Sequence, residues 1–311
     1  CGGDVSRGGG GGAHRQLGAP ATTVAVFKLP RSGSTWFTEK LNAFSSVFIS
    51  KEIIQAEPDE IYSQLEKLRH LKRALRWPTG KMSTGAWGGR FRVDYWDKTK
   101  WARRLDVLGF TVNPVKVQMD YHRLMRRRPE AFVVAFVRTN VVKTVVSAVR
   151  GAMTYKLCGT DNLTREQAVI CKVPSRIRID VDQFWAMLVE RLRLERRFVE
   201  LVYSASAAGP VYEVTYEDLQ LDESKVLRDL FSHLGAADAL AAVRASRDGW
   251  VKRTSDDLRD ALENFGEVRA MLVERGNKCL VAQLDVAEKG VGFPPCPLAV
   301  GVGGPSTPVD S

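Results

Sequence analysis

The run Ala131–Val137, AFVVAFV, most constrains what this 311-residue chain can fold into. Its apolar side chains do not alternate with polar ones, which predicts a strand covered on both faces, as in the middle of a parallel sheet. A second apolar run spans Thr23 to Lys28, and a helical pattern follows each run, at residues 34–44 and 141–155. This alternation predicts an α/β domain with a central parallel β-sheet flanked by helices.

Similar patterns extend along the rest of the chain. We expect further strands at residues 47–50, 115–118 and 211–215, and further helices at 58–75, 120–127, 181–203, 223–234 and 255–275. Both ends are rich in glycine, a composition typical of segments that do not pack. The predicted organisation is therefore a mobile tail at 1–22, one domain at 23–285 and a second mobile tail at 286–311.

The formal net charge of +10 and the pI near 9.5 favour an anionic ligand or surface, because a positive field concentrates anions near the protein. A nucleic-acid partner is disfavoured, since the chain has no zinc finger, ribonucleoprotein signature or basic zipper. No apolar stretch approaches the ~18 residues of a membrane span. The sequence starts with Cys1 rather than Met, which leaves room for a targeting or anchor segment ahead of it.

Five cysteines are present, and none belongs to a CxxC pair, so a structural zinc site is not expected. Cys158 and Cys171, and likewise Cys279 and Cys296, are close enough in sequence to close local disulfide loops. Asn162 begins the glycosylation acceptor pattern Asn-Leu-Thr. These features favour an oxidising lumen, with free buried thiols and a chance pattern as the alternative.

The stretch KLPRSGSTW, residues 28–36, lies directly between the first strand and its helix. Gly33 permits close approach of an anion to the backbone, and Ser34 and Thr35 place hydroxyls and amides at a helix N-terminus, which binds phosphate. Arg31 adds a fixed cation with a fork of N–H groups. An ATPase loop would read GxxxxGK[ST], and its lysine is missing here.

This loop resembles the 5′-phosphosulfate loop of sulfotransferases that use 3′-phosphoadenosine 5′-phosphosulfate (PAPS), where Pro-Lys-Ser-Gly-Thr-Thr-Trp and Arg-Ser-Gly-[Ser/Thr]-[Thr/Ser] are the usual forms. The resemblance implies a sulfotransferase fold related to P-loop nucleoside triphosphatases, with PAPS as sulfuryl donor, 3′-phosphoadenosine 5′-phosphate (PAP) as product, and no metal. Arg31 would then meet the leaving phosphate oxygen, and the 5′-phosphate would lie against Ser32, Gly33, Ser34, Thr35 and Trp36.

The family has a second phosphate motif, an arginine at a strand end and a serine in the next helix, which bind the 3′-phosphate. FVRTNVVKTVVSAV supplies Arg138 and Ser147. The two are nine positions apart where the cytosolic pattern has eight, and nodulation-type and trehalose sulfotransferases look more like this chain. The alternative for Ser147 is a small residue at a helix packing contact.

The acceptor hydroxyl needs a base, and tyrosylprotein and trehalose-type members use a glutamate after the second strand. Glu52 ends the expected second strand, 21 positions after Arg31, and is our candidate. A partly desolvated carboxylate has a raised pKa, which suits proton abstraction. A solvated Glu52 paired with Lys51 is the alternative, and His122 is the second candidate base.

Two weaker similarities support the family. VYEVTYEDL, residues 211–219, resembles a strand and turn that are structural in many sulfotransferases. Lys252 and Arg253 resemble the basic loop that closes over the nucleotide, with a solvated basic turn as the alternative.

The resemblance therefore implies transfer of a sulfuryl group from PAPS to a hydroxyl acceptor, and we expect this acceptor to be a carbohydrate or glycan. The expected location is the Golgi or another secretory-pathway lumen, with a cytoplasmic location as the alternative. Competing interpretations are a nucleotide or sugar kinase with a degenerate phosphate loop, and an inactive anion- or glycan-binding protein on the same fold. Acceptor pockets are built from variable loops, here residues 77–101 and 156–180, whose composition does not identify the acceptor. The oligomeric state is equally undetermined by the sequence.

Overall fold

The computed structural model describes residues 22–52, 105–117, 131–159, 170–171, 173–206, 209, 211–243 and 255–297. Within these ranges one sheet is formed by the strands β1 (Thr22–Lys28), β2 (Val47–Glu52), β3 (Val107–Val112), β4 (Phe132–Val137) and β5 (Val211–Thr215). Its order is β2-β3-β1-β4-β5, and every neighbouring pair is parallel. The predicted fold class, an α/β domain with a central parallel sheet, is confirmed.

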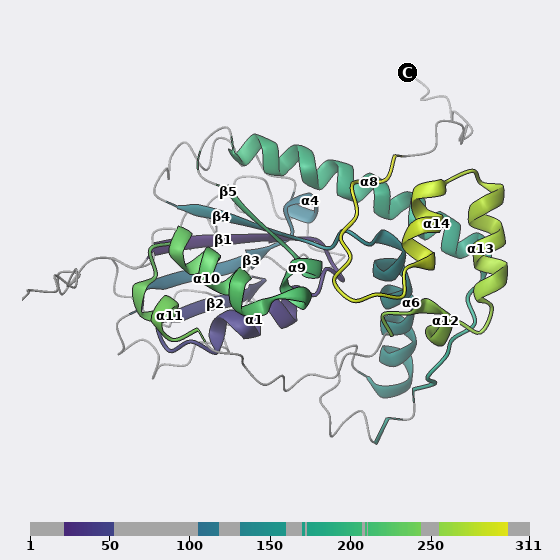
Figure 1. The fold of residues 1–311 in the computed structure, drawn as a ribbon, viewed down its shortest axis with the longest axis horizontal. Helices are drawn as coiled ribbons and strands as arrows, with labels where there is room; N and C mark the ends of the chain where they lie inside the picture. Colours follow the sequence, from purple (N-terminus) through teal and green to yellow (C-terminus); the bar gives the residue numbers. More distant parts are fainter. Residues whose placement is uncertain are drawn as a thin grey trace, which may run out of the picture.

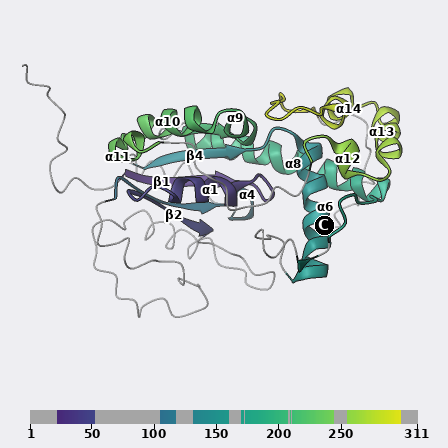
Figure 2. The same cartoon turned by 60° about the horizontal axis from the view of Figure 1, so that its bottom comes forward.

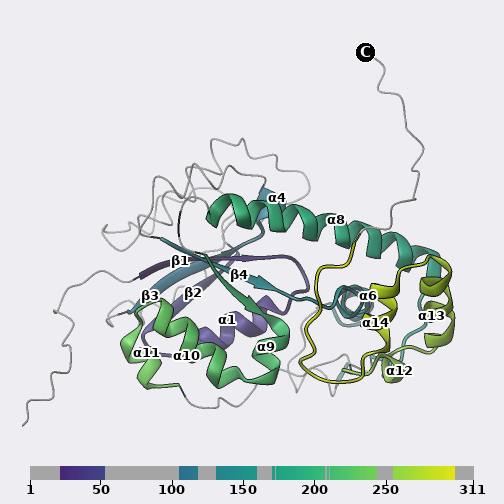
Figure 3. The ribbon, with the colours of Figure 1, turned by 45° about the horizontal axis from the view of Figure 1, so that its top comes forward.

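Helices cover both faces of this sheet (Figures 1 and 3). On one face, Phe198 and Leu201 of the 26-residue helix α8 (Val181–Ser206) pack against alternate residues of β1 and β4, including Phe27. On the other face, α1 (Ser34–Asn42), α10 (Glu223–His233) and α11 (Ala237–Ala241) cover the intervening residues, and Phe37 stacks on Phe136 with ring centroids 4.4 Å apart. The uninterrupted apolar sequence of β4 follows from burial on both sides.

A third hydrophobic cluster lies at the end of the sheet where β4 leads into α6 (Val141–Cys158). It joins α6 and the first part of α8 to α12 (Leu258–Ala261), α13 (Phe265–Glu274) and α14 (Lys278–Asp285), which gather at that end in Figure 2. Asn140 caps α6 as expected, because its side chain accepts a hydrogen bond from the Lys143 amide. The valines of α6 are compatible with a helix here because most of them are buried in this cluster.

The strand expected at 115–118 was wrong. The third strand lies earlier, at β3, and the short helix α4 (Pro114–Val117) follows it. Gly109 in the middle of β3 weakened the sequence signal for a strand. The glycine is needed there, since a Cβ on it would lie 2.5 Å from the Val24 carbonyl oxygen and 2.8 Å from Ile49 Cδ1.

The helix expected at 255–275 is broken into α12 and α13. The break occurs because Leu262 pairs with Ile177, and the Asn264 side chain accepts from the Ile179 amide and donates to its carbonyl. These contacts hold residues 177–179 against the third cluster. The sequence also gave no signal for α9 (Tyr216–Leu221), α11 or α14 as separate helices. The helices expected at 58–75 and 120–127 lie outside the described residues.

Both predicted cysteine pairs form disulfides, Cys158–Cys171 and Cys279–Cys296. The second lies within the segment from α14 to residue 297, part of which we assigned to a mobile tail. Residues 286–297 are instead held against the domain by this disulfide and by a hydrogen bond from the Phe293 amide to Thr139 Oγ1. The outer limits of the two tails stay a prediction. Among the described helices, none has the length and apolar character that crossing a membrane requires.

Candidate functional site

Three loops meet at the carboxyl edge of the sheet because β1, β4 and β5 are neighbours and all run the same way. The first follows Lys28, the second follows Val137, and the third begins at Tyr216, directly after β5. In open α/β sheets, ligands bind outside this edge, in the crevice between loops. The two phosphate motifs predicted from the sequence are therefore adjacent in space.

The first loop, residues 29–33, has an unusual backbone. Arg31 has φ of 62° and is the one non-glycine residue with positive φ in the described part of the chain, a conformation that costs energy and tends to persist at functional sites. Gly33, at φ 87° and ψ 13°, precedes α1, and no side chain of the described residues caps this helix. Ser32 is 1% exposed, and its hydroxyl has no hydrogen-bond partner among the described residues. Such a buried hydroxyl is suited to a ligand that completes its hydrogen bonding.

The remaining predicted loop residues lie on the first turn of α1. Ser34 is buried, Thr35 is exposed, and Trp36 is partly buried with its ring edge-on to Tyr216 at 5.5 Å. The amides of this turn belong to the helix N-terminus, which carries a partial positive charge. The position of these residues is the one expected of an anion-binding turn.

Tyr216 connects the first loop to the second. A Cβ added to Gly33 would lie 2.5 Å from Tyr216 Cδ2, so the glycine makes room for the tyrosine ring. On the second loop, the Arg138 guanidinium carbon lies 4.6 Å from the centroid of the same ring, a cation–π distance. One aromatic ring thus contacts the backbone of the first loop and the cation of the second.

The second loop is fixed by the carboxylate of Glu217, which is 4% exposed. It accepts hydrogen bonds from the amides of Thr139 at 3.0 Å and Asn140 at 3.2 Å. Arg138, immediately before them, is 9% exposed, and its Nε has no hydrogen-bond partner among the described residues. A buried guanidinium N–H without a partner is costly in a folded protein unless a ligand supplies one.

Arg31 reaches from the first loop to α6. A Cβ added to Gly151 would lie 2.6 Å, 2.7 Å and 2.8 Å from the Nη1, Cζ and Nη2 atoms of Arg31, so the guanidinium rests directly on this glycine. Ser147 is half-buried and lies one helical turn before Gly151. Residues four apart in a helix share a face, so Ser147 lies on the face of α6 that meets Arg31.

A buried ion pair on α8 contacts the backbone of the first loop. Arg191 donates from Nη1 to the Pro30 carbonyl at 2.7 Å, and its Nε pairs with Glu195 at 2.9 Å. Burial raises the pKa of Glu195, an effect that Arg191 opposes and Glu217 adds to. Burial also lowers the pKa of Arg191, with a further contribution from the charge of Arg138. The charge of Arg138 on the second loop therefore acts on Arg191, which contacts the first loop, in a weakly solvated region.

The candidate base lies at the same edge of the sheet. Glu52 is the last residue of β2 and pairs with Thr111 of β3, the strand that lies between β2 and β1. With two strand spacings between β2 and β1, the Glu52 backbone is roughly 10 Å from the end of β1. Its side chain, together with His122, Lys252 and Arg253, lies outside what the structure describes. No group of acidic, histidine or cysteine side chains suited to a metal is found in the described ranges.

Three residues in this arrangement were not assigned a role at the site from the sequence. Tyr216 and Glu217 belong to the Tyr-Glu-Asp-Leu turn, whose position directly after a strand next to β4 was the available signal. Gly151 gave no signal, because a single glycine within a helical pattern has no defined meaning until its neighbour is known. The chemistry that the site offers is binding of two anionic groups, one at each loop.

No protein-family model and no curated protein matches this chain. Among solved structures, it is similar to a sulfotransferase from Alicyclobacillus acidocaldarius, with 13% identity and a TM-score of 0.38, over 86% of this chain and 94% of that chain. It is also similar to sulfotransferase STF9 from Mycobacterium avium, with 11% identity and a TM-score of 0.36, over 83% of this chain and 76% of that chain. Likenesses at this level carry no weight for activity, which has to be inferred from the residues of the site.

Proposed function

We propose that this protein is a sulfotransferase that transfers the sulfuryl group of PAPS to a hydroxyl acceptor. The observation that carries the proposal is the pair of adjacent anion-binding loops joined by Tyr216. Each loop holds a buried polar atom without a partner in the described structure, Ser32 Oγ in one and Arg138 Nε in the other. PAPS carries phosphate at both its 5′ and 3′ positions, so it can occupy both loops at once.

The second loop distinguishes this proposal from a kinase. A nucleoside triphosphate presents its phosphates as one chain, which a P-loop holds with its lysine and a magnesium ion. Here the lysine is missing, and a second cation, Arg138, contacts the ring of Tyr216, which also lies against Gly33 of the first loop. This geometry suits two separate phosphates better than one triphosphate.

The roles proposed for the side chains follow from their positions. Arg31 and the loop from Ser32 to Trp36 bind the 5′-phosphate and stabilise negative charge as the bond between sulfur and the bridging oxygen breaks. Arg138 and Ser147 bind the 3′-phosphate, while Lys252 and Arg253 close over the nucleotide. Such catalysis depends on orientation and electrostatics and needs no covalent enzyme intermediate.

Glu52 is the proposed base. Its carboxylate takes the proton of the acceptor hydroxyl as the oxygen forms its bond to sulfur, opposite the leaving phosphate oxygen. In this scheme the products are the sulfated acceptor and PAP. The position of Glu52 at the carboxyl edge of β2, on the β3 side of the first loop, supports an acceptor that approaches from that side.

We further propose a carbohydrate or glycan acceptor and a secretory-lumen location such as the Golgi. The two disulfides are compatible with an oxidising compartment. The net positive charge suits an anionic glycan as well as the sulfuryl donor. A transfer assay with labelled PAPS and a panel of glycans, tyrosine peptides, lipids and small metabolites tests this choice directly.

The test of the sulfuryl-donor site uses PAP, because it binds without needing an acceptor. PAP is expected to raise the melting temperature of the wild-type protein, and Arg138→Ala is expected to remove most of that increase. Arg197→Ala is the matched control, since Arg197 pairs with Glu200 on the exposed surface of α8. An undiminished shift in Arg138→Ala would show that the second phosphate site is elsewhere.

A further inference from the structure

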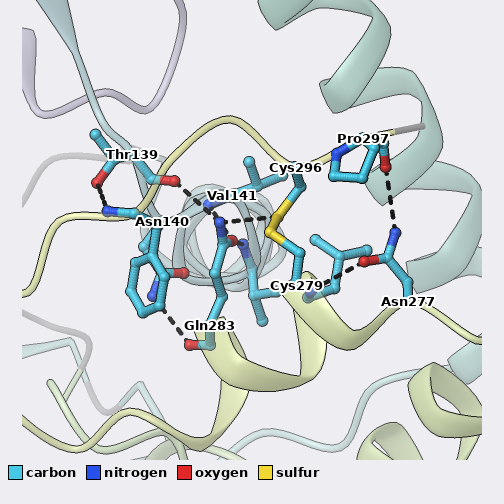
Figure 4. Close-up of a disulfide and its surroundings, with 11 residues drawn as sticks. Thr139, Asn140, Val141, Asn277, Cys279, Gln283, Cys296 and Pro297 are labelled. Atoms are coloured by element: carbon cyan, nitrogen blue, oxygen red, sulfur yellow. Dashed lines mark hydrogen bonds between the residues drawn. A yellow bond between two sulfur atoms is a disulfide. The ribbon is translucent and has the colours of Figure 1, made fainter. Parts of the chain in front are cut away.

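The segment that follows α13 contacts the second loop through Gln283 of α14. Gln283 is 0% exposed, and its side-chain oxygen accepts hydrogen bonds from the amides of Val141 at 2.8 Å and Val142 at 3.3 Å. Its side-chain nitrogen donates to the Thr139 carbonyl at 3.2 Å, and its own carbonyl accepts from Asn140 Nδ2 at 2.9 Å. Figure 4 shows Gln283 beside Thr139, Asn140 and Val141 and next to the Cys279–Cys296 disulfide.

These hydrogen bonds involve backbone and side-chain polar groups of the residues at the N-terminus of α6. The first amides of a helix have no partner within the helix, and here a glutamine side chain from α14 supplies one. The position of the turn therefore depends on a residue more than 140 positions later in the chain. A ligand phosphate near Arg138 meets a turn whose amides are already bonded, so binding relies on the placement of Arg138.

Thr139 is held from two directions. Glu217 accepts from its amide, while Gln283 and Phe293 contact its carbonyl and hydroxyl. The first contact comes from the β5 side, and the other two come from the C-terminal segment. These contacts of Glu217, Gln283 and Phe293 with Thr139 form a clamp on the second loop. Arg138 directly precedes Thr139, so the clamp orients the backbone from which the Arg138 side chain extends.

The disulfide ties this C-terminal segment together. Cys279 lies one helical turn before Gln283 on α14, and Cys296 Sγ itself accepts a hydrogen bond from Gln283 Nε2 at 3.2 Å. The cross-link joins α14 to the segment that carries Phe293. Without it, the clamp on the second loop would rest on non-covalent contacts alone.

We propose that Gln283 is a positioning residue for Arg138, held in place by the Cys279–Cys296 disulfide, and that the two together set the affinity for the 3′-phosphate of the sulfuryl donor. This inference rests on the proposed function and adds the C-terminal segment to the donor site. It assigns different roles to the disulfides, because Cys158–Cys171 closes at the opposite end of α6. With 18 residues in α6, that end is about 25 Å from the second loop.

The experiment measures dissociation constants by isothermal titration with two probes, PAP and adenosine 5′-monophosphate (AMP), which lacks the 3′-phosphate. The proteins are the wild type, Gln283→Met, and the double variant Cys279→Ala/Cys296→Ala. The matched control is Cys158→Ala/Cys171→Ala, which removes the disulfide at the far end of the same helix. Gln283→Met keeps the length of the side chain and removes its hydrogen bonds.

We expect PAP to bind roughly tenfold more weakly to Gln283→Met and to Cys279→Ala/Cys296→Ala. In these variants the second loop has lost contacts that hold it before binding, so the ligand must order it. AMP should change by less than about twofold, since the first loop is untouched, and the control variant should match the wild type with both probes. This split between the probes separates positioning from a general loss of stability. If Gln283→Met does not fold, the disulfide variant makes the same comparison.

Unchanged PAP binding in these variants, or an equal loss of PAP and AMP affinity, would overturn the inference. Equal weakening in the far-end control would overturn it too. A wild-type protein that binds no PAP would contradict the proposed function itself, and the inference with it. The two failures are therefore distinguishable by the wild-type titration.

Discussion

Gly151→Ala tests whether Arg31 holds the 5′-phosphate. The added Cβ would lie 2.6–2.8 Å from the guanidinium of Arg31, whereas carbon atoms in comfortable contact are about 3.5–4.0 Å apart. The guanidinium must therefore move by about 1 Å. Because it is the far end of a flexible side chain, it can do so without displacing α6 or the first loop.

The loss in affinity follows from the hydrogen bonds that this shift disrupts. Hydrogen bonds to charged groups contribute about 1.5–3 kcal/mol, which corresponds to roughly a 10- to 150-fold increase in the dissociation constant for PAP. The stability of the free protein should change little or rise, since alanine in a helix interior is favoured over glycine by about 0.5–1 kcal/mol. Binding is measured by titration calorimetry and stability by urea unfolding.

Gly266→Ala is the matched control, because Gly266 lies in α13 and an added Cβ there meets no atom of the described residues within 4 Å. It should leave PAP binding unchanged. If Gly151→Ala also binds PAP as the wild type does, Arg31 does not hold the phosphate. If Gly151→Ala instead loses several degrees in melting temperature without ligand, the glycine serves the fold and our reasoning about Arg31 is refuted.

Two further predictions concern carboxylates. Glu52→Gln should bind PAP as the wild type does but lose sulfuryl transfer from PAPS in an assay with a working acceptor. Transfer at the wild-type rate would show that Glu52 is not the base and would leave His122 as the candidate. Burial raises the pKa of Glu195 in the folded protein, so this carboxyl keeps its proton to a higher pH in the folded state than in the unfolded state. The contribution of Glu195 to the stability of the fold therefore falls as the pH rises from about 4.5 through the raised pKa. The free energy of unfolding, measured with urea over this pH range, should decline by at most about 1.4 kcal/mol per pH unit for this reason in the wild type, and Glu195→Gln should lack this decline. Parallel pH profiles of wild type and variant would contradict the prediction.

Much of the sheet was predictable because its strands carry strong local signals. The apolar sequence of β4 and the loop after β1 defined two adjacent strands and the helices that follow them. β3 escaped prediction because Gly109, which permits close approach of β1, also weakens strand propensity. Local sequence cannot show that a glycine is required by a neighbouring strand.

The candidate site was predictable to a similar extent. The motifs proposed Arg31 and Arg138 as site residues, and the parallel sheet brings their loops together. The groups that hold these loops, Glu217 and Gln283, act through tertiary contacts that span 77 to 144 residues of sequence. Such contacts leave no periodic pattern, so only the folded structure reveals them.

The central claim is that the site binds a nucleotide with separate 5′ and 3′ phosphates. Titration of the wild-type protein with PAP, AMP and ATP tests this most directly, with magnesium present for ATP. We expect PAP to bind more tightly than both AMP and ATP, because it alone fills both loops. Binding of ATP that is tighter than that of PAP, or equal binding of PAP and AMP, would contradict the claim.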